Sequence, residues 1–326
     1  MVRFRPGTGP RFLITVDTEE EFNWGVPHSR TGYGLEHTRN IARFQSFCEN
    51  LGAIPLYLVD YPIATSPDCA EILRRPLAEG RAEIGIHLHP WVNPPFEEKV
   101  CEYNTFPGNL PEPLERAKFI ALRDAIERNF ATSPICYRAG RYGVGPNTVS
   151  ILKDCGIAID TSARSRFDYS STGGANFRDL PVRPWWVDPE RRLMEVPLTT
   201  VFWGPLRRQG AWLYPRMWRI PRLRGALARM GMLERIPLSP EGISAEEAIR
   251  AIDVAIDDGL PLLVFSFHSP SLAPGHTPYV RDEAELDRFY DWWRAILAHL
   301  GQRNVQPTGM QGVMESVVLA TDASPS

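Results

Sequence analysis

Short apolar runs alternate with helix-like segments along most of the chain, and this alternation limits the folds open to it. The runs lie at 12–16, 54–59, 82–87, 135–137, 158–160 and 260–267, and the helical patterns at 36–50, 68–79, 114–130, 147–155, 244–258 and 283–300. Apolar runs separated by helices in this way are typical of parallel βαβ units. The sequence therefore predicts an α/β fold built on a mostly parallel sheet.

A polar or charged residue ends each apolar run or directly follows it. These residues are Asp17, Asp60, His87 with His89, Arg138, Asp160 and His268. In parallel α/β barrels the carboxyl ends of the strands form the rim on which active sites are built. We therefore expect these side chains to gather at one rim.

His87 and His89 stand two residues apart at the end of the third run. Residues i and i+2 of a strand project from the same face, so both imidazoles can point at one place. Imidazole is the commonest side-chain ligand of transition metals, although two turn histidines without a shared role give the same pattern. Their place on the predicted rim favours a metal site.

Composition limits the other classes of function. A chain of 326 residues with a net charge of −3 gives no reason to expect nucleic acid as a partner, and we expect a single domain over 1–326. No apolar run is long enough to cross a bilayer. The five scattered cysteines favour reduced thiols, and no secretory signal is seen, so the sequence predicts a cytoplasmic protein.

The alternation breaks down between 168 and 240. Residues 195–202 read as one strand, and an inserted helical segment is expected at about 205–240. That segment combines aromatic with basic residues: Trp212, Tyr214, Trp218, Arg207, Arg208, Arg216, Arg219, Arg222, Arg224, Arg229 and Arg235. This composition suits peripheral contact with a membrane or an anionic glycan, and equally a helical insertion whose rings pack on the barrel.

Four elements in order along the chain resemble the motifs of the polysaccharide deacetylase superfamily (NodB-like, carbohydrate esterase family 4). They are Thr15-Val16-Asp17-Thr18, His87 with His89, Arg138 through Tyr142, and Phe265-Ser266-Phe267-His268. The resemblance covers roughly 12–302 without the insertion. It implies a distorted parallel (β/α)7-type barrel with an arginine- and aromatic-rich helical insertion.

The chain departs from the family pattern at its predicted metal site. Thr18 stands where the family has a second aspartate, and the two histidines are two rather than four residues apart. Glu19 can supply the missing carboxylate. The expected ligands are therefore His87, His89 and either Glu19 or Asp17. The DTEEEF and HLHPW sequences are similar to those of a divergent subgroup.

The resemblance implies metal-dependent removal of an N-acetyl group from an amino sugar of a polysaccharide or a nucleotide- or lipid-linked precursor. One divalent ion, expected to be Zn²⁺, would activate a water molecule. Asp17 is expected to act as the base beside Arg138, His268 as the acid, and a backbone N–H near Tyr142 to face the oxyanion. Further substrate contacts are expected from Asp60, Trp91 and Arg141.

Several supporting roles are also predicted. Asp160 or Asp168 is expected to pair with His268, and Glu20 and Glu21 to face solvent. Two other functions stay open: a catalytically inactive glycan-binding relative, and a barrel hydrolase acting on another small C–N amide. Bound metal and acetate release distinguish these from the deacetylase.

Overall fold

The structure is a computed structural model that describes residues 1–217 and 220–318. Trp218 and Arg219 of the predicted arginine-rich segment lie outside the described residues. Within the described ranges no helix is both long and apolar enough to span a bilayer.

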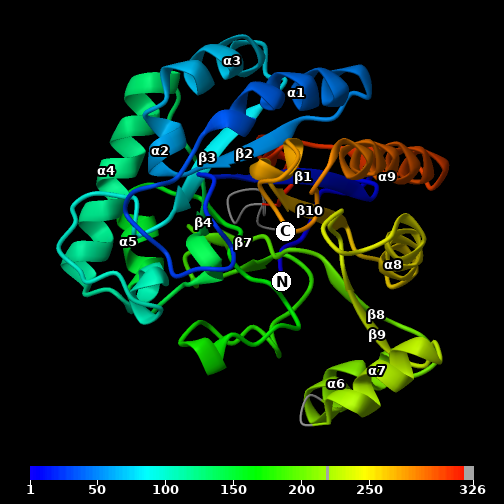
Figure 1. Cartoon of the computed structure of the whole chain (residues 1–326). Helices are drawn as coiled ribbons and strands as arrows, with labels where there is room; N and C mark the ends of the chain where they lie inside the picture. The colour runs from blue at the N-terminus through cyan, green and yellow to red at the C-terminus, as the bar shows by residue number, and fades with distance from the viewer. Residues whose placement is uncertain (218–219, 319–326) are drawn as a thin grey trace, which may run out of the picture.

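The main sheet curls into an incomplete barrel whose path holds seven parallel strands in the described part of the chain (Figure 1). In spatial order they are β10 (Leu262–His268), β1 (Arg11–Thr18), β2 (Pro55–Val59), β3 (Glu83–Leu88), β4 (Cys136–Ala139), β5 (Ile159–Asp160) and β7 (Met194–Glu195). The antiparallel β6 (Trp185–Trp186) follows β7, and β11 (Gln306–Pro307) pairs with β1. The predicted distorted parallel barrel is confirmed.

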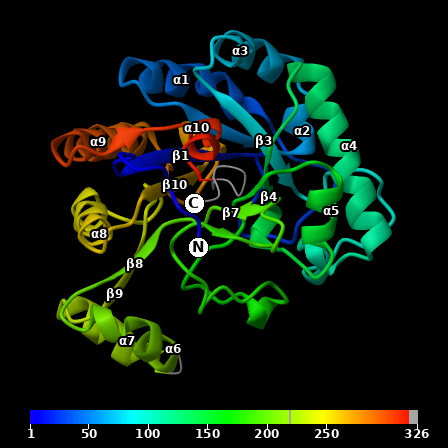
Figure 2. The same cartoon turned by 180° about the vertical axis from the view of Figure 1, so that it is seen from behind.

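Helices ring the sheet, as Figure 2 shows from behind. They are α1 (Ile41–Asn50), α2 (Tyr61–Ala64), α3 (Pro67–Ala78), α4 (Glu112–Phe130), α5 (Thr148–Asp154), α8 (Ala245–Asp257), α9 (Glu283–Gln302) and α10 (Met310–Glu315). The predicted capping box opens α8: Ser244 Oγ accepts from the N–H of Glu247, and the Glu247 carboxylate accepts from the N–H of Ser244. The large outer core lies between these helices and the strands.

Alternation along the strands sorts the inward side chains of the barrel into layers. Near the amino ends, Leu13 and Leu262 belong to an apolar cluster that Met310 of α10 completes. At the carboxyl ends the neighbouring strands bring Asp17 opposite His268, and His87 opposite Arg138. The apolar layers thus form a rigid floor beneath the polar rim.

The inserted segment leaves the barrel as a separate hairpin (Figure 1). It comprises β8 (Thr200–Trp203), α6 (Gly210–Met217), α7 (Pro221–Arg229) and the antiparallel β9 (Glu234–Pro237). The prediction of one strand over 195–202 is wrong. Glu195 ends β7 in the barrel, whereas Thr200 begins β8, because the chain turns away between them. At the hairpin base the Ser266 N–H donates to the Leu238 carbonyl at 3.2 Å, which ties the insertion to β10.

Candidate active site

Asp17 and Arg138 form a buried ion pair at the centre of the rim. Arg138 Nε also donates to the Thr161 carbonyl at 3.0 Å, which fixes the guanidinium. Burial tends to raise the pKa of Asp17, but the charge and hydrogen bond of Arg138 and the charge of His268 outweigh it and hold that pKa below its usual value. Asp17 is therefore an ionised carboxylate, as a general base must be.

Glu19 lies between the two predicted histidine ligands. Its Oε2 is 3.4 Å from Nε2 of His87 and 3.4 Å from Nε2 of His89. All three side chains are buried, and their ligand atoms lie within 4.8 Å of one another. Its other oxygen, Oε1, is buried and has no hydrogen-bond partner among the described residues. Of the two carboxylates that the sequence left open, Glu19 rather than Asp17 faces both imidazoles.

The remote nitrogens of both imidazoles face hydrogen-bond acceptors. His87 Nδ1 is 3.2 Å from the Arg138 carbonyl oxygen, and His89 Nδ1 is 2.9 Å from Glu20 Oε2. These acceptors place the proton on Nδ1 and leave the lone pair on Nε2, toward Glu19. Burial lowers the pKa of both rings, that of His89 to about 3, so both are neutral. Ligand imidazoles in metal sites are oriented in the same way.

This donor set fits a divalent cation. Burial raises the pKa of Glu19 to about 7, against the opposing charge of His268. A buried carboxylate with an unbonded oxygen is costly unless a positive charge compensates it. Two neutral imidazole nitrogens and one carboxylate are a ligand set that Zn²⁺ favours, and three protein ligands leave a coordination position open.

Glu20 and Asp60 support this cluster from behind. Glu20 was predicted to face solvent, and this is wrong, because it is fully buried and binds His89. The N–H of Glu20 donates to Asp60 Oδ2 at 2.7 Å, and Asp60 Oδ1 caps α2 through the N–H of Ile63. Burial and the neighbouring Glu20 raise the pKa of Asp60 well above its usual value. The predicted substrate contact of Asp60 is corrected, because its side chain is fully buried and lies outside the cavity.

Trp91 also supports the metal cluster. Its ring is stacked between His89 and His28, with centroids 4.2 Å from each, and its Nε1 donates to Glu20 Oε1 at 2.6 Å. Only 2% of Trp91 is exposed, although it lies at the wall of the cavity. Trp91 thus orients His89 and Glu20, and its predicted contact with the substrate stays a prediction.

Glu21 was also predicted to face solvent, and this too is wrong. It is half-buried, and its Oε1 lies 2.9 Å from Nδ1 of the buried His37. Its Oε2 lies 3.4 Å from His276 Nδ1. Glu21 therefore fixes His37, which in turn lies 2.8 Å from Ser269 Oγ beneath the rim.

His268 lies across the rim at the end of β10. Its Nε2 is 4.0 Å from Asp17 Oδ2, and its Nδ1 is 2.7 Å from Glu241 Oε2. Burial tends to lower the pKa of His268, but the charges of Glu241, Glu19 and Asp17 outweigh it and raise the pKa to about 10. The ring is thus an imidazolium and can donate a proton.

Glu241 is the functional residue that sequence reasoning missed. The predicted partners of His268 were wrong: Asp160 bonds Ser162 inside the sheet, and Asp168 bonds Ser170 on an outer loop. Glu241 lies in the turn after β9, 27 residues from His268, and the N–H of His268 also donates to it at 3.0 Å. Glu241 lies in a Ser-Pro-Glu-Gly sequence, which predicts a turn and gives no indication of a partner for His268.

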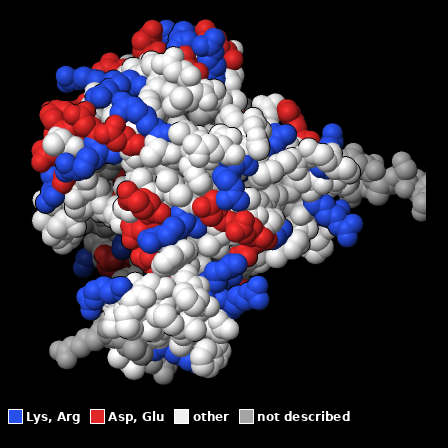
Figure 3. Space-filling model, turned by 90° about the vertical axis from the view of Figure 1, so that its right-hand side faces the viewer, with Lys and Arg blue, Asp and Glu red and all other residues white. Residues whose placement is uncertain are grey.

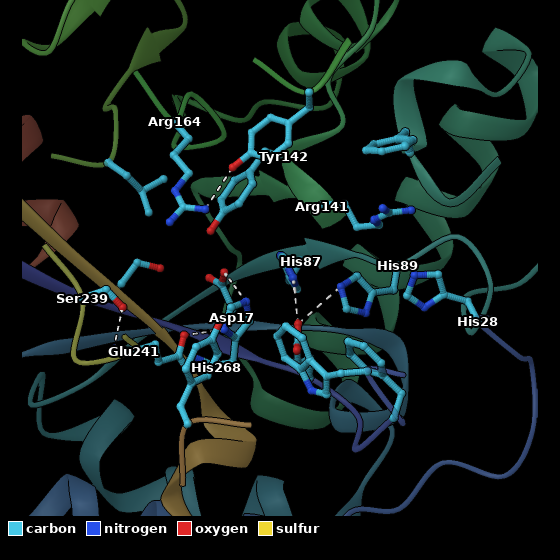
Figure 4. A pocket seen from close by; sticks show the side chains of 18 of the residues that line it. Asp17, His28, His87, His89, Arg141, Tyr142, Arg164, Ser239, Glu241 and His268 are labelled. Carbon is cyan, nitrogen blue, oxygen red and sulfur yellow. Dashed lines mark hydrogen bonds and ion pairs between the residues drawn. The ribbon is translucent and has the colours of Figure 1, made fainter. Parts of the chain in front are cut away.

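A cavity of about 440 Å³ opens above the rim (Figure 4). Asp17, His87, His89 and His268 converge on its floor, while Arg141, Tyr142 and Arg164 form the facing wall.

A strained turn after β4 positions that wall. Arg141 and Tyr142 have φ values of 54° and 58°, in the left-handed region. Gly140 lets this turn pass close to the His89 side chain, because a Cβ at position 140 would lie 2.5 Å from His89 Cδ2. Arg141 donates to Glu102 Oε1 at 2.6 Å. Arg141 and Tyr142 therefore face the cavity, as a substrate contact and an oxyanion turn require.

No family model matches the sequence, and no curated protein matches it. The fold is similar to solved structures at low identity. A protein named as a polysaccharide deacetylase from Mycobacterium smegmatis is 14% identical, with 94% of this chain and 95% of that chain covered and a TM-score of 0.49. A family 4 acetyl xylan esterase from Clostridium thermocellum is 12% identical, with 93% and 90% covered and a TM-score of 0.44.

A higher TM-score, 0.57, relates the chain to the 4-alpha-glucanotransferase from Thermococcus litoralis, at 12% identity. That match covers 95% of this chain and 41% of that one. Polysaccharide deacetylases are thus among the solved structures that the chain is similar to, as its motifs predicted. At these identities the likeness concerns the fold, and the chemistry must be argued from the residues on the rim.

Proposed function

We propose that the chain is a metal-dependent hydrolase that removes an N-acetyl group from an amino sugar of a polysaccharide or glycan precursor. The observation that carries this proposal is Glu19 held between Nε2 of His87 and His89, beside an ionised Asp17 and a protonated His268. A divalent ion bound by those three ligands supplies a Lewis acid and lowers the pKa of a water molecule. A base and an acid of opposite protonation state complete a hydrolytic site.

Asp17 accepts a proton from the water as the water oxygen attacks the acetyl carbonyl carbon. Arg138 keeps the carboxylate ionised and oriented throughout, because its other donors are fixed by Thr15 and Ser266 at 3.0 Å each. Backbone N–H groups of the strained turn at Tyr142 are proposed to stabilise the negative charge on the former carbonyl oxygen.

His268 then protonates the sugar nitrogen. The C–N bond breaks, the amine leaves with that proton, and the water oxygen stays with the acetate. Glu241 holds the imidazolium through Nδ1, so that the Nε2 proton points toward Asp17 and the cavity. Trp24, 39% exposed at the cavity mouth and 5.1 Å from the His268 ring, offers an aromatic face to the sugar.

Metal content and acetate release together test the proposal. We expect purified protein to hold about one divalent ion per chain, and a His87→Ala/His89→Ala variant to lose both the ion and acetate release from N-acetylated amino sugars. A matched His299→Ala variant should keep both the ion and acetate release, because His299 lies near the end of α9 and pairs with Asp253 of α8. A metal-free protein that binds glycan without acetate release would indicate the inactive glycan-binding relative. Metal-free cleavage of another amide would indicate the alternative hydrolase.

Peripheral membrane contact through 205–240 is a second, independent proposal. Trp212 and Met230 are 61% and 63% exposed, and Figure 3 shows this lobe as a largely uncharged surface edged by basic side chains. Trp212→Ser should reduce sedimentation with anionic vesicles, whereas Leu51→Ser, at an exposed apolar residue directly after α1, should not. Equal sedimentation of both variants and the parent would contradict it.

We also propose a reducing compartment such as the cytoplasm. All five cysteines are free, and three of them are buried. Thiols of this kind persist where disulfides are not formed. A precursor glycan, rather than a finished wall polymer, is the substrate that such a compartment favours.

A further inference from the structure

A second cavity, of about 510 Å³, adjoins the first on the side of the insertion. The two cavities share Arg164 and Tyr169 in their walls. The rest of the second cavity comes from the 164–178 loop and from β8, α6 and β9. Nothing in the proposed deacetylation uses these residues.

The second cavity is cationic. Arg164, Arg166, Arg178 and Arg235 line it, against the single carboxylate of Asp168. Asp168 lies 3.8 Å from Arg178 and accepts hydrogen bonds from Ser170. Within the described ranges, neither Arg164 nor Arg166 lies within 4.0 Å of a carboxylate oxygen, and Arg164 Nε is buried without a hydrogen-bond partner. Half-buried guanidinium groups without counter-charges indicate a site for an anion.

Aromatic rings hold two of these guanidinium groups in place. Arg164 Cζ lies 4.1 Å from the Phe167 ring centroid, and Arg235 Cζ lies 3.5 Å from the same ring. Arg235 also lies 4.8 Å from the Tyr214 ring. Arg235 Nη1 donates to the Arg166 carbonyl at 2.7 Å, and Arg164 Nη1 donates to Tyr169 Oη at 2.9 Å, so both guanidinium groups are fixed in the wall. Arg164 Nε has no hydrogen-bond partner among the described residues, and it can therefore donate to a phosphate oxygen.

We propose that the second cavity binds the diphosphate of a glycosyl diphosphate whose N-acetylated sugar occupies the first cavity. This inference rests on the proposed function and names its substrate class. Arg164 stands at the junction, where the sugar–phosphate bond would lie. The aromatic walls formed by Phe167, Phe202 and Tyr214 can accept the group on the far phosphate, which is either a nucleoside or an isoprenoid.

Calorimetric binding to the whole protein tests the site without requiring catalysis. The probes are inorganic pyrophosphate, UDP-N-acetylglucosamine, farnesyl-diphospho-N-acetylglucosamine and the neutral N,N′-diacetylchitobiose. Arg166→Gln and Arg235→Gln should each weaken the binding of the three diphosphates by at least about tenfold, because each removes one positive charge from the wall of the cavity. Arg208→Gln, an exposed arginine of the same segment outside the cavity, should leave them within about twofold. Chitobiose binding should be the same in all variants.

The outcomes separate the two proposals. Diphosphate binding that both cavity variants weaken, without acetate release, keeps the second cavity as a diphosphate site and contradicts the proposed deacetylation. Acetate release from chitobiose with no diphosphate binding, or with equal affinity in all variants, overturns the diphosphate site alone. If UDP-N-acetylglucosamine binds more tightly than pyrophosphate, the group on the far phosphate is a nucleoside. If the farnesyl compound binds more tightly than pyrophosphate, that group is an isoprenoid. Equal affinities show that the diphosphate alone is recognised.

Discussion

The two adjoining cavities differ in both chemistry and origin. The first carries Asp17, His87 and His268 on strand ends, above a packed barrel floor. The second carries guanidinium groups on a loop and on the inserted hairpin. Groups that move protons need fixed geometry, which strands supply, whereas groups that select a substrate can stand on added segments. The comparison therefore separates a reaction site from a specificity site.

Substitutions in the two cavities should therefore have different effects on turnover and on substrate binding. A change on the barrel rim should lower turnover of every N-acetylated substrate by the same factor. A change in the second cavity should weaken only substrates that carry a diphosphate.

Asp17→Asn should lower kcat by roughly 100- to 10,000-fold on both neutral and diphosphate substrates, with little change in KM. The amide keeps the shape of the carboxylate but cannot accept the proton. Acetate release under saturating substrate measures the loss, and circular dichroism checks that the fold survives next to the buried Arg138. Asp154→Asn, at an exposed aspartate of α5, is the matched control. Unchanged acetate release by Asp17→Asn would remove Asp17 as the base.

Glu19→Gln should weaken metal binding by at least about 100-fold and yet stabilise the metal-free protein. The pKa of Glu19 is about 7 when folded and near 4.5 when unfolded. Between these values the folded state keeps a proton that the unfolded state has lost, so the free energy of unfolding falls as pH rises. Removing the carboxylate should add about 1–3 kcal/mol at pH 8 and nothing at pH 4. Denaturant unfolding in the presence of a chelator measures the free energy of unfolding of both proteins. A variant that is less stable than the parent at pH 8 would contradict the prediction.

Glu20→Gln should weaken metal affinity by about 10- to 100-fold while sparing the fold. The amide can accept only one of the two hydrogen bonds that now reach the carboxylate from His89 and Trp91. Competition with a metal-sensing dye measures the affinity. Glu36→Gln, an exposed glutamate, should be neutral. Equal affinities in both variants would show that Glu20 does not orient His89.

Glu241→Gln should move the basic limb of the pH–rate profile to lower pH. His268 must be protonated to act, so activity is lost as pH rises through its pKa. Because the negative charge of Glu241 raises that pKa, removing the charge lowers it. A bound cation lowers the pKa in both proteins and leaves the direction of the difference unchanged. Profiles of kcat against pH for the variant and the parent protein test this. If the basic limb lies at the same pH in both, a group other than His268 is the general acid.

Sequence patterns predicted the rim well because its residues obey a local rule. Asp17, His87, Arg138 and His268 each end an apolar run, and parallel strands bring such ends together without further information. The spacing of the histidine pair, which departs from the family pattern, is accommodated by Glu19, as the sequence allowed. The position of each rim residue depends on the apolar run next to it in the chain, so it can be recognised from the sequence.

Features that depend on distant packing were not predictable in the same way. Glu20 looks like part of an exposed acidic run, and it is buried only because Asp60 and Trp91 arrive from other strands. Glu241 reaches His268 only because the inserted hairpin returns to β10 at its base. The second cavity likewise exists only where the hairpin meets the 164–178 loop. Of its arginines, only Arg235 belongs to the basic and aromatic segment predicted from the sequence, and the other three lie outside that segment.

Raising NaCl from low to high concentration should have the smallest effect and still separate the two cavities. Salt screens the attraction between a dianionic diphosphate and the arginines of the second cavity, so KM for a diphosphate substrate should rise about threefold between 0.05 and 0.5 M. KM for neutral chitobiose should not move, because its contacts carry no net charge. The ratio of the two KM values cancels general salt effects on the enzyme. A ratio that stays constant would mean that the guanidinium groups do not meet the substrate, however firmly Asp17 and His268 act on it.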